Sequence, residues 1–364
     1  ETKQPQTSPA QTRENIMGTM EINPLLVKLS VPMMISMLVQ ALYNVVDSVF
    51  VSHVSENALT AVSLAFSLQN VMIAVGVGTG VGVNAMLSKS LGEKNQSRAN
   101  ATAKNGIFLS LCSFVVFLVI GLTCMKPYFY AQTSDAAIAQ QGIQYLSVCC
   151  IFSLGLFTQT MGEKLLAATG RTHLSMISQL VGAVVNIILD PILIFALNMG
   201  VRGAATATVI SQAVGAVWVL RFLTGSRTRL RLSVKNMPLV GKVIGPCLGL
   251  GVSTFVMIAT ESILSISFNS SLARYGGDIA VGAMTIITSA TQLLSMPVQG
   301  LCQGAQPIMS FNFGAGKGDR VKQAFRLQFI ICVAYAAAFW AACMLVPQMF
   351  ASIFSTDPEL VRYT

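Results

Sequence analysis

Three carboxylates lie inside long apolar runs of this sequence. Asp47, Asp190 and Glu261 each interrupt a stretch that is long enough to cross a bilayer as a helix. A carboxylate in the hydrocarbon layer costs at least about 2.5–3.5 kcal/mol on insertion scales, so it normally faces an internal cavity and has a function there. These three residues are therefore the first candidates for a buried site that handles charge.

Helical spacing places further polar groups beside two of these acids. Gln40, Tyr43 and Asp47 follow one another at i, i+3 and i+7, which puts them on one face of a helix. Asn186 and Asp190 are i, i+4 neighbours and also share a face. The acids are therefore expected to belong to polar stripes and not to isolated positions.

The candidate groups also lie at similar depths. Counting about 1.5 Å per residue along each apolar run places Asp47, Tyr145, Asp190, Thr208 and Glu261 in the same half of the membrane. Polar residues on unrelated helices need not lie at the same depth. We therefore expect these polar groups to meet in one chamber.

Two kinds of chemistry suit this set. Two carboxylates close together in a low dielectric cannot easily both ionise, so the pair could hold a proton. Alternatively, oxygen atoms of Asp47, Asn186, Asp190 and Thr208 could hold a hard monovalent cation such as Na⁺. Asp190 alone could also simply satisfy a helix broken at Pro191, and the sequence leaves these alternatives open.

The composition predicts an all-α polytopic membrane protein. Apolar residues make up 53% of the 364 residues and charged residues 10%, and the mean hydropathy is +0.66, whereas a soluble domain has about 25% charge. The sequence shows no nucleophile–base arrangement, so we do not expect an enzyme. We also expect no cofactor. The expected spans cover residues 25–52, 58–88, 104–125, 136–160, 173–198, 203–223, 239–268, 279–311, 323–346, and from 357 onward.

Lysine and arginine concentrate in alternate connections between these spans. By the positive-inside rule the basic connections, and with them the N-terminus, are predicted to face the cytoplasm of a cell membrane. Lys164 belongs to one of these predicted loops. The net charge of +9 is therefore attributed to topology, and no nucleic-acid partner is expected.

The sequence contains an internal repeat. A shift of 222 residues aligns Gly78 with Gly300, Gly82 with Gly304 and Gly92 with Gly314, and a shift of 214 aligns Asp47 with Glu261. The second copy is expected to have a longer outer loop, at residues 269–278. An even number of spans per copy predicts two six-helix bundles related by a pseudo-two-fold axis along the membrane normal.

The repeat also predicts the domain organisation. A polar tail (1–24) precedes an amino-terminal lobe of spans 1–6 (25–223), a basic cytoplasmic linker (224–238) and a carboxy-terminal lobe (239–364) with spans 7–9 and the start of span 10. Because the second copy is incomplete, we expect the sequence to be part of a twelve-helix protein.

Three segments resemble a known family. Pro32 with Leu42-Tyr-Asn-Val-Val-Asp47, Asn186-Ile-Ile-Leu-Asp190-Pro191 and Gly203-Ala-Ala-Thr-Ala-Thr208 are similar to motifs of multidrug and toxic compound extrusion (MATE) transporters. The resemblance covers nearly everything from Ile22 onward. It implies a secondary antiporter that exports organic, often cationic, drugs in exchange for H⁺ or Na⁺, and we expect this antiporter to be a monomer.

The resemblance also implies roles for individual residues. Asp47, Asn186, Asp190 and Thr208 would form an amino-lobe cation site, and Glu261 would be the carboxy-lobe acid. Gln40, Tyr43 and Tyr145 would be drug or network positions, and Pro32 the hinge of span 1. The alternative function on this scaffold is a flippase for lipid-linked or polysaccharide precursors, which the near absence of Lys and Arg from the spans disfavours.

Overall fold

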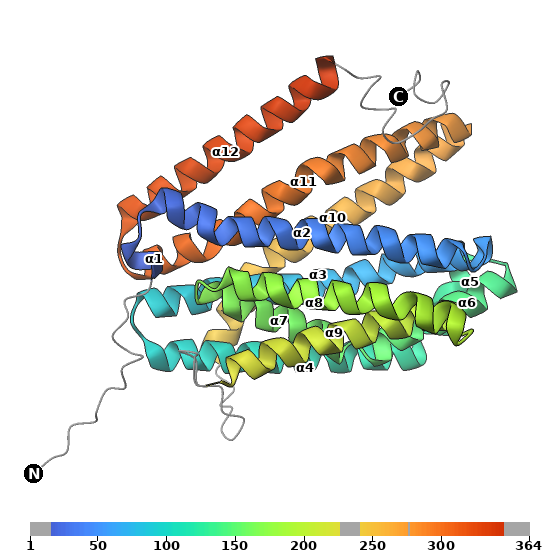
Figure 1. The fold of residues 1–364 in the computed structure, drawn as a ribbon, viewed down its shortest axis with the longest axis horizontal. Coiled ribbons are helices and arrows are strands. Elements are labelled where there is room, and N and C mark those ends of the chain that lie inside the picture. Colours follow the sequence, from blue (N-terminus) through green and yellow to red (C-terminus); the bar gives the residue numbers. More distant parts are fainter. Residues whose placement is uncertain (1–15, 226–240, 276, 346–364) are drawn as a thin grey trace, which may run out of the picture.

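The computed structural model describes residues 16–225, 241–275 and 277–345, and every regular element in these ranges is a helix (Figure 1). The helices are α1 (Ile16–Thr19), α2 (Ile22–Ser52), α3 (Glu56–Gly92), α4 (Gln96–Thr123), α5 (Met125–Gln132), α6 (Ala136–Ile151), α7 (Leu154–Ala168), α8 (Thr172–Pro191), the π-helix η2 (Ile192–Ala196), α9 (Val201–Leu223), α10 (Gly241–Tyr275), α11 (Gly277–Gly314) and α12 (Gly318–Leu345).

Most of these helices can cross a membrane. Seven of the described helices are long and apolar enough to span a bilayer, and the pair α6 and α7, which is bent by 49° at its break, makes an eighth when it is counted as one span. The prediction of an all-α polytopic membrane protein is confirmed. Large apolar side chains such as Val217, Phe329 and Trp340 are exposed on the outside of the bundle, where a bilayer would cover them.

The fourth predicted span was wrong at its carboxy-terminal end. The single span 136–160 is the pair α6–α7, and helix continues to Ala168. Lys164, which we had expected in a cytoplasmic loop, is buried in α7 with 7% of its surface exposed. The adjacent charges of Glu163 and Lys164 lower the local hydropathy, which is typical of a loop. In the structure, however, these two side chains are surrounded by protein and not by lipid.

Three other boundaries differ from expectation. The outer loop predicted at residues 269–278 is largely absent, because α10 continues to Tyr275. Helix α4 begins eight residues before the expected start at 104, where Asn95 caps it by accepting a hydrogen bond from the Arg98 amide. Residues 16–24 of the predicted tail are mostly helical. Most of the predicted linker and the expected tenth span lie outside the described residues.

The amino-terminal lobe (α2–α9) and the carboxy-terminal helices (α10–α12) meet through equivalent contacts. Helix α3 packs against α10, and its repeat counterpart α11 packs against α2 (Figure 1). Gly82 on α3 contacts the backbone of Cys247, and the equivalent Gly304 on α11 contacts Ser30. A Cβ atom at either glycine would collide with the facing helix, so small residues permit this close approach. These contacts confirm the predicted repeat.

Candidate functional site

Asp47 and Asp190 lie close to one another in the amino-terminal lobe. Helix α2 carries Asp47 and packs against α8, which carries Asp190 and Asn186. Asp47 is 6% exposed and Asp190 is completely buried. The two carboxylates are within electrostatic range of each other. The structure therefore brings together two acids that are far apart in the sequence.

Three oxygen atoms in this cluster have no hydrogen-bond partner among the residues that the structure describes. They are Oδ1 of Asp47, Oδ1 of Asn186 and Oδ2 of Asp190, and all three are buried. The one side-chain hydrogen bond within the set runs from Asn186 Nδ2 to Asp190 Oδ1, at 3.4 Å. Buried polar atoms are usually paired, so three unpaired acceptors in one place indicate a position that a proton, a cation or water would complete.

Thr208 lies on α9, in the same amino-terminal lobe as the two acids. Its hydroxyl donates to the carbonyl oxygen of Ala204 at 3.0 Å, so its lone pairs remain available as acceptors. The approach of α9 depends on Gly203, because a Cβ atom there would lie 2.7 Å from the backbone carbonyl group of Leu193 in η2. Pro191, which ends α8, has no N–H to continue the helix, and the π-helical turn η2 follows it.

Two tyrosines border the acids. Tyr145 on α6 is fully buried and lies within electrostatic range of Asp47 and Tyr43. Tyr43 on α2 is in turn within range of both Asp47 and Asp190. Gln69 on α3, which the sequence reasoning had missed, reaches the side chain of Tyr145. Its position inside a long apolar helix was the available signal.

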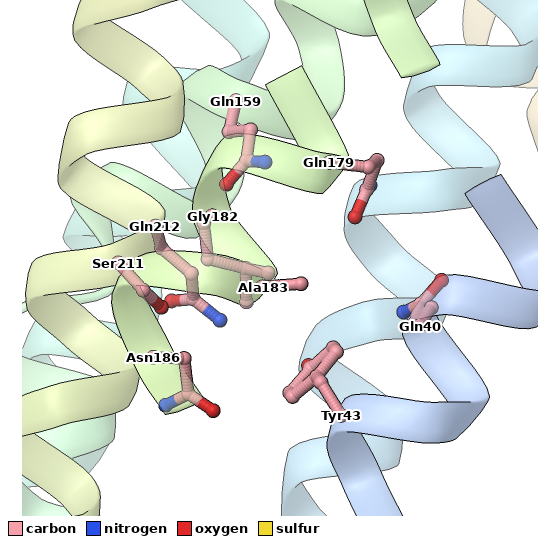
Figure 2. Close-up of a pocket in the computed structure, with 10 residues that line it drawn as sticks. Gln40, Tyr43, Gln159, Gln179, Gly182, Ala183, Asn186, Ser211 and Gln212 are labelled. Atoms are coloured by element: carbon pink, nitrogen blue, oxygen red, sulfur yellow. The ribbon is translucent and has the colours of Figure 1, made fainter. Parts of the chain in front are cut away.

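A polar pocket adjoins the acidic cluster (Figure 2). Its cavity volume is about 50 Å³, and the total empty space, which includes open solvent at its mouth, is about 410 Å³. Its lining comprises Gln40, Tyr43, Leu156, Gln159, Gln179, Gly182, Ala183, Asn186, Ser211 and Gln212. Asn186 belongs both to this pocket and to the acidic cluster, which makes it the physical link between them.

The sequence reasoning missed a third buried acid. Glu163 on α7 is 8% exposed, and its two carboxylate oxygens accept hydrogen bonds from Gln159 and Gln179 of the pocket lining. Gln159 and Glu163 are i, i+4 neighbours, which is the spacing that could have revealed them. Reading the neighbouring Lys164 as a loop residue hid that signal.

Glu261 and Pro32 lie apart from the unpaired oxygens. Glu261 is on the exposed surface of α10, and no contact joins it to Asp47 or Asp190 in the described part of the chain. Pro32 is half-buried inside α2, where its carbonyl oxygen accepts a hydrogen bond from the Ser36 hydroxyl at 3.0 Å. Both roles given to these residues by resemblance remain predictions.

Known proteins share both sequence and fold with this chain. A multidrug export protein, MepA, of Staphylococcus haemolyticus is 25% identical over 91% of this chain and 73% of its own length. The solved outward-facing structure of a multidrug resistance MATE family transporter is similar with a TM-score of 0.88, at 26% identity, over 94% of this chain and 76% of that one.

A transporter of the MOP superfamily from Pyrococcus furiosus, whose binding pocket is described as having reverse polarity, gives a TM-score of 0.89 at 25% identity. The similarity covers 96% of this chain and 78% of that one. The MatE family profile matches residues 32–192 and 254–364, which include Asp47, Asp190 and the pocket residues on α2, α7 and α8. The chain therefore belongs to the MatE family and is a membrane transporter and not an enzyme.

Proposed function

We propose that this protein is a multidrug efflux antiporter that exports organic cations in exchange for H⁺ or Na⁺. The relatives at 25% and 24% identity are multidrug export proteins. The observation that supports exchange is the set of three buried, unpartnered oxygens on Asp47, Asn186 and Asp190. A proton would relieve the repulsion between the two carboxylates, and Na⁺ would take the free oxygens as ligands together with Thr208.

Asn186 provides the proposed coupling between the ion and the drug. Its amide nitrogen bonds to Asp190, while its side chain also borders the pocket. An ion that changes the hydrogen bonding of Asp190 therefore changes the lining that a drug meets. Exchange requires only that the ion and the drug bind the two transport states with different affinities.

The pocket chemistry favours an organic cation over a lipid pyrophosphate. The pocket lining contains neither Lys nor Arg, and its side chains donate hydrogen bonds to two buried acids, Asp190 and Glu163. A flippase that binds pyrophosphate would need basic groups at this position. The flippase alternative therefore receives no support from the lining.

The proposed orientation keeps the N-terminus and the basic ends of the helices in the cytoplasm of a cell membrane. Lys317 donates a hydrogen bond to the carbonyl oxygen of Gly18, and Gly314 contacts the backbone of Lys89. The basic ends of α3 and α11 thus lie together with α1 at one end of the bundle (Figure 1). The positive-inside rule assigns such an end to the cytoplasm.

Transport by purified protein in proteoliposomes tests this function. An outward drug flux should be driven by an imposed H⁺ gradient or by an imposed Na⁺ gradient, each applied with the other ion at equilibrium. Asp47→Asn and Asp190→Asn should each reduce that flux to the level of empty liposomes. Asp319→Asn, at an exposed acid of α12, is the matched control and should transport normally. Wild-type flux from both site variants would overturn the proposal.

A further inference from the structure

Glu163 places a buried carboxyl group beneath the pocket. It makes no ion pair in the described part of the chain, where the ion pairs join Glu93 to Lys89 and Arg98. The ammonium of the neighbouring Lys164 donates to Gln303 of α11 at 2.6 Å. Glu163 is kept in the interior by hydrogen bonds from two glutamines. When Glu163 is ionised, its charge acts on the pocket, and the ammonium of the adjacent Lys164 offsets only part of it.

The same carboxylate determines how the two glutamines face the pocket. Gln159 Nε2 donates to Glu163 Oε1 at 3.0 Å, and Gln179 Nε2 donates to Glu163 Oε2 at 2.8 Å. An ionised carboxylate only accepts, so each amide must turn its NH₂ group toward Glu163. Each carbonyl oxygen then projects the other way. Figure 2 shows the Gln179 oxygen directed toward the space that Gln40 and Tyr43 border.

Two further lining residues show the same polarity. The Ser211 hydroxyl donates to the carbonyl oxygen of Thr208 at 2.8 Å, which leaves its oxygen as an acceptor. Asn186 directs its nitrogen to Asp190, and its oxygen has no partner. Four polar side chains of the pocket thus direct donors into the protein and retain acceptors.

We propose that Glu163 is the positioning residue that makes this pocket selective for organic cations with N–H donors. It does so by adding negative charge and by turning Gln159 and Gln179 so that their carbonyl oxygens face the ligand. Ammonium, amidinium and aryl-amine cations match this lining, and organic anions do not. The inference rests on the proposed function only in taking this pocket as the drug-binding site.

Glu163→Gln tests the inference with almost no change in volume. It removes the charge and replaces one acceptor oxygen by an NH₂ group. One of the two facing amides must then rotate to present its oxygen to that group, and its own NH₂ turns toward the pocket. The variant should therefore lose affinity for cations and gain affinity for anions.

Binding to purified protein in nanodiscs can be measured with three probes. Ethidium is a cation with two aryl amines, tetraphenylphosphonium is a cation without an N–H group, and carboxyfluorescein is an anion. Loss of one charge-assisted hydrogen bond corresponds to about tenfold or more in affinity. Glu163→Gln should therefore weaken ethidium binding about tenfold, weaken tetraphenylphosphonium binding less, and strengthen carboxyfluorescein binding.

Exchanging the carboxylate between positions 163 and 179 tests whether Glu163 acts by positioning the amides or only by stabilising the fold. In Glu163→Gln combined with Gln179→Glu, the new amide can donate to the new carboxylate, and a negative charge returns to the pocket. The double variant should recover the preference for ethidium over carboxyfluorescein. Glu93→Gln, at an exposed ion pair on the basic end of α3, is the control and should keep wild-type affinities.

Each outcome decides the inference. An unchanged order of probe affinities in both Glu163→Gln and the double variant would overturn it, and so would equal losses for the three probes in a folded protein. If Glu163→Gln does not fold, the double variant alone decides. Wild-type protein that binds these cations but exchanges none of them for H⁺ or Na⁺ would refute the proposed function and leave this inference standing.

Discussion

Gln303→Leu is expected to shift the balance between the two transport states. Gln303 on α11 accepts a hydrogen bond from the Lys164 ammonium of α7 at 2.6 Å, and its own amide nitrogen lies 3.7 Å from Met37 Sδ of α2. Both contacts cross from one lobe to the other. They exist only while the lobes touch at their basic end, so removing them should favour the state in which that end is open.

The size of the expected shift in the open fraction follows from the kind of hydrogen bond that is lost. A hydrogen bond to a charged group contributes about 1.5–3 kcal/mol. Leucine also leaves the Lys164 ammonium buried without its acceptor in the closed state, whereas water can reach that ammonium in the open state. The open fraction should therefore rise about tenfold to a hundredfold.

Alkylation of Cys247 reports on this opening. Cys247 is 1% exposed and packs against Gly82 at the contact between the lobes, so a maleimide can reach it only when α3 and α10 separate. The other seven of the eight cysteines would be replaced. The initial alkylation rate is proportional to the open fraction, so Gln303→Leu should raise it about tenfold or more while the transporter remains folded.

Gln328→Leu is the matched control for this experiment. Gln328 donates to Cys302 Sγ at 3.0 Å within the carboxy-terminal helices, so its contact does not cross between lobes. Because the reporter protein lacks the Cys302 thiol, the control also measures the effect of a glutamine-to-leucine change itself. An alkylation rate in Gln303→Leu that equals the Gln328→Leu rate would refute the reasoning.

Two further substitutions test the packing that positions the site and α1. Gly203→Val adds side-chain atoms against the Leu193 carbonyl group and should destabilise the protein by about 1–3 kcal/mol; it should lower the melting temperature relative to Gly245→Val, which has open space around it. An unchanged melting temperature would contradict this packing. Arg320→Ala removes hydrogen bonds to the carbonyl oxygens of Met17 and Met20, so amide exchange should accelerate in residues 16–20 alone. Equal exchange in variant and wild type would show that α1 is held by other contacts.

Local periodicity was sufficient to predict most of the helices and one face of the site. Gln40, Tyr43 and Asp47 share a face because their spacing on a helix is a property of one segment. The repeat was equally visible, since the matched glycines Gly82 and Gly304 occur at a constant separation. Such features depend on neighbours along the chain, and the sequence displays those neighbours directly.

Helix ends and breaks were less predictable for the same reason. Hydropathy measures preference for lipid, but Lys164 and Glu163 are surrounded by protein groups that satisfy them. The break between α6 and α7 and the extension of α10 to Tyr275 also depend on packing that no local window contains.

The sequence by itself determined that this chain is a helical membrane protein with buried acids, because apolar content and helical spacing are local properties. Only the tertiary structure decided which acids meet. It placed Asp47 beside Asp190, put Glu261 on the exposed surface of α10, and revealed Glu163 beneath the pocket. The physical reason is that the environment of a carboxylate is made by side chains from other helices, and helix packing alone brings those side chains to it.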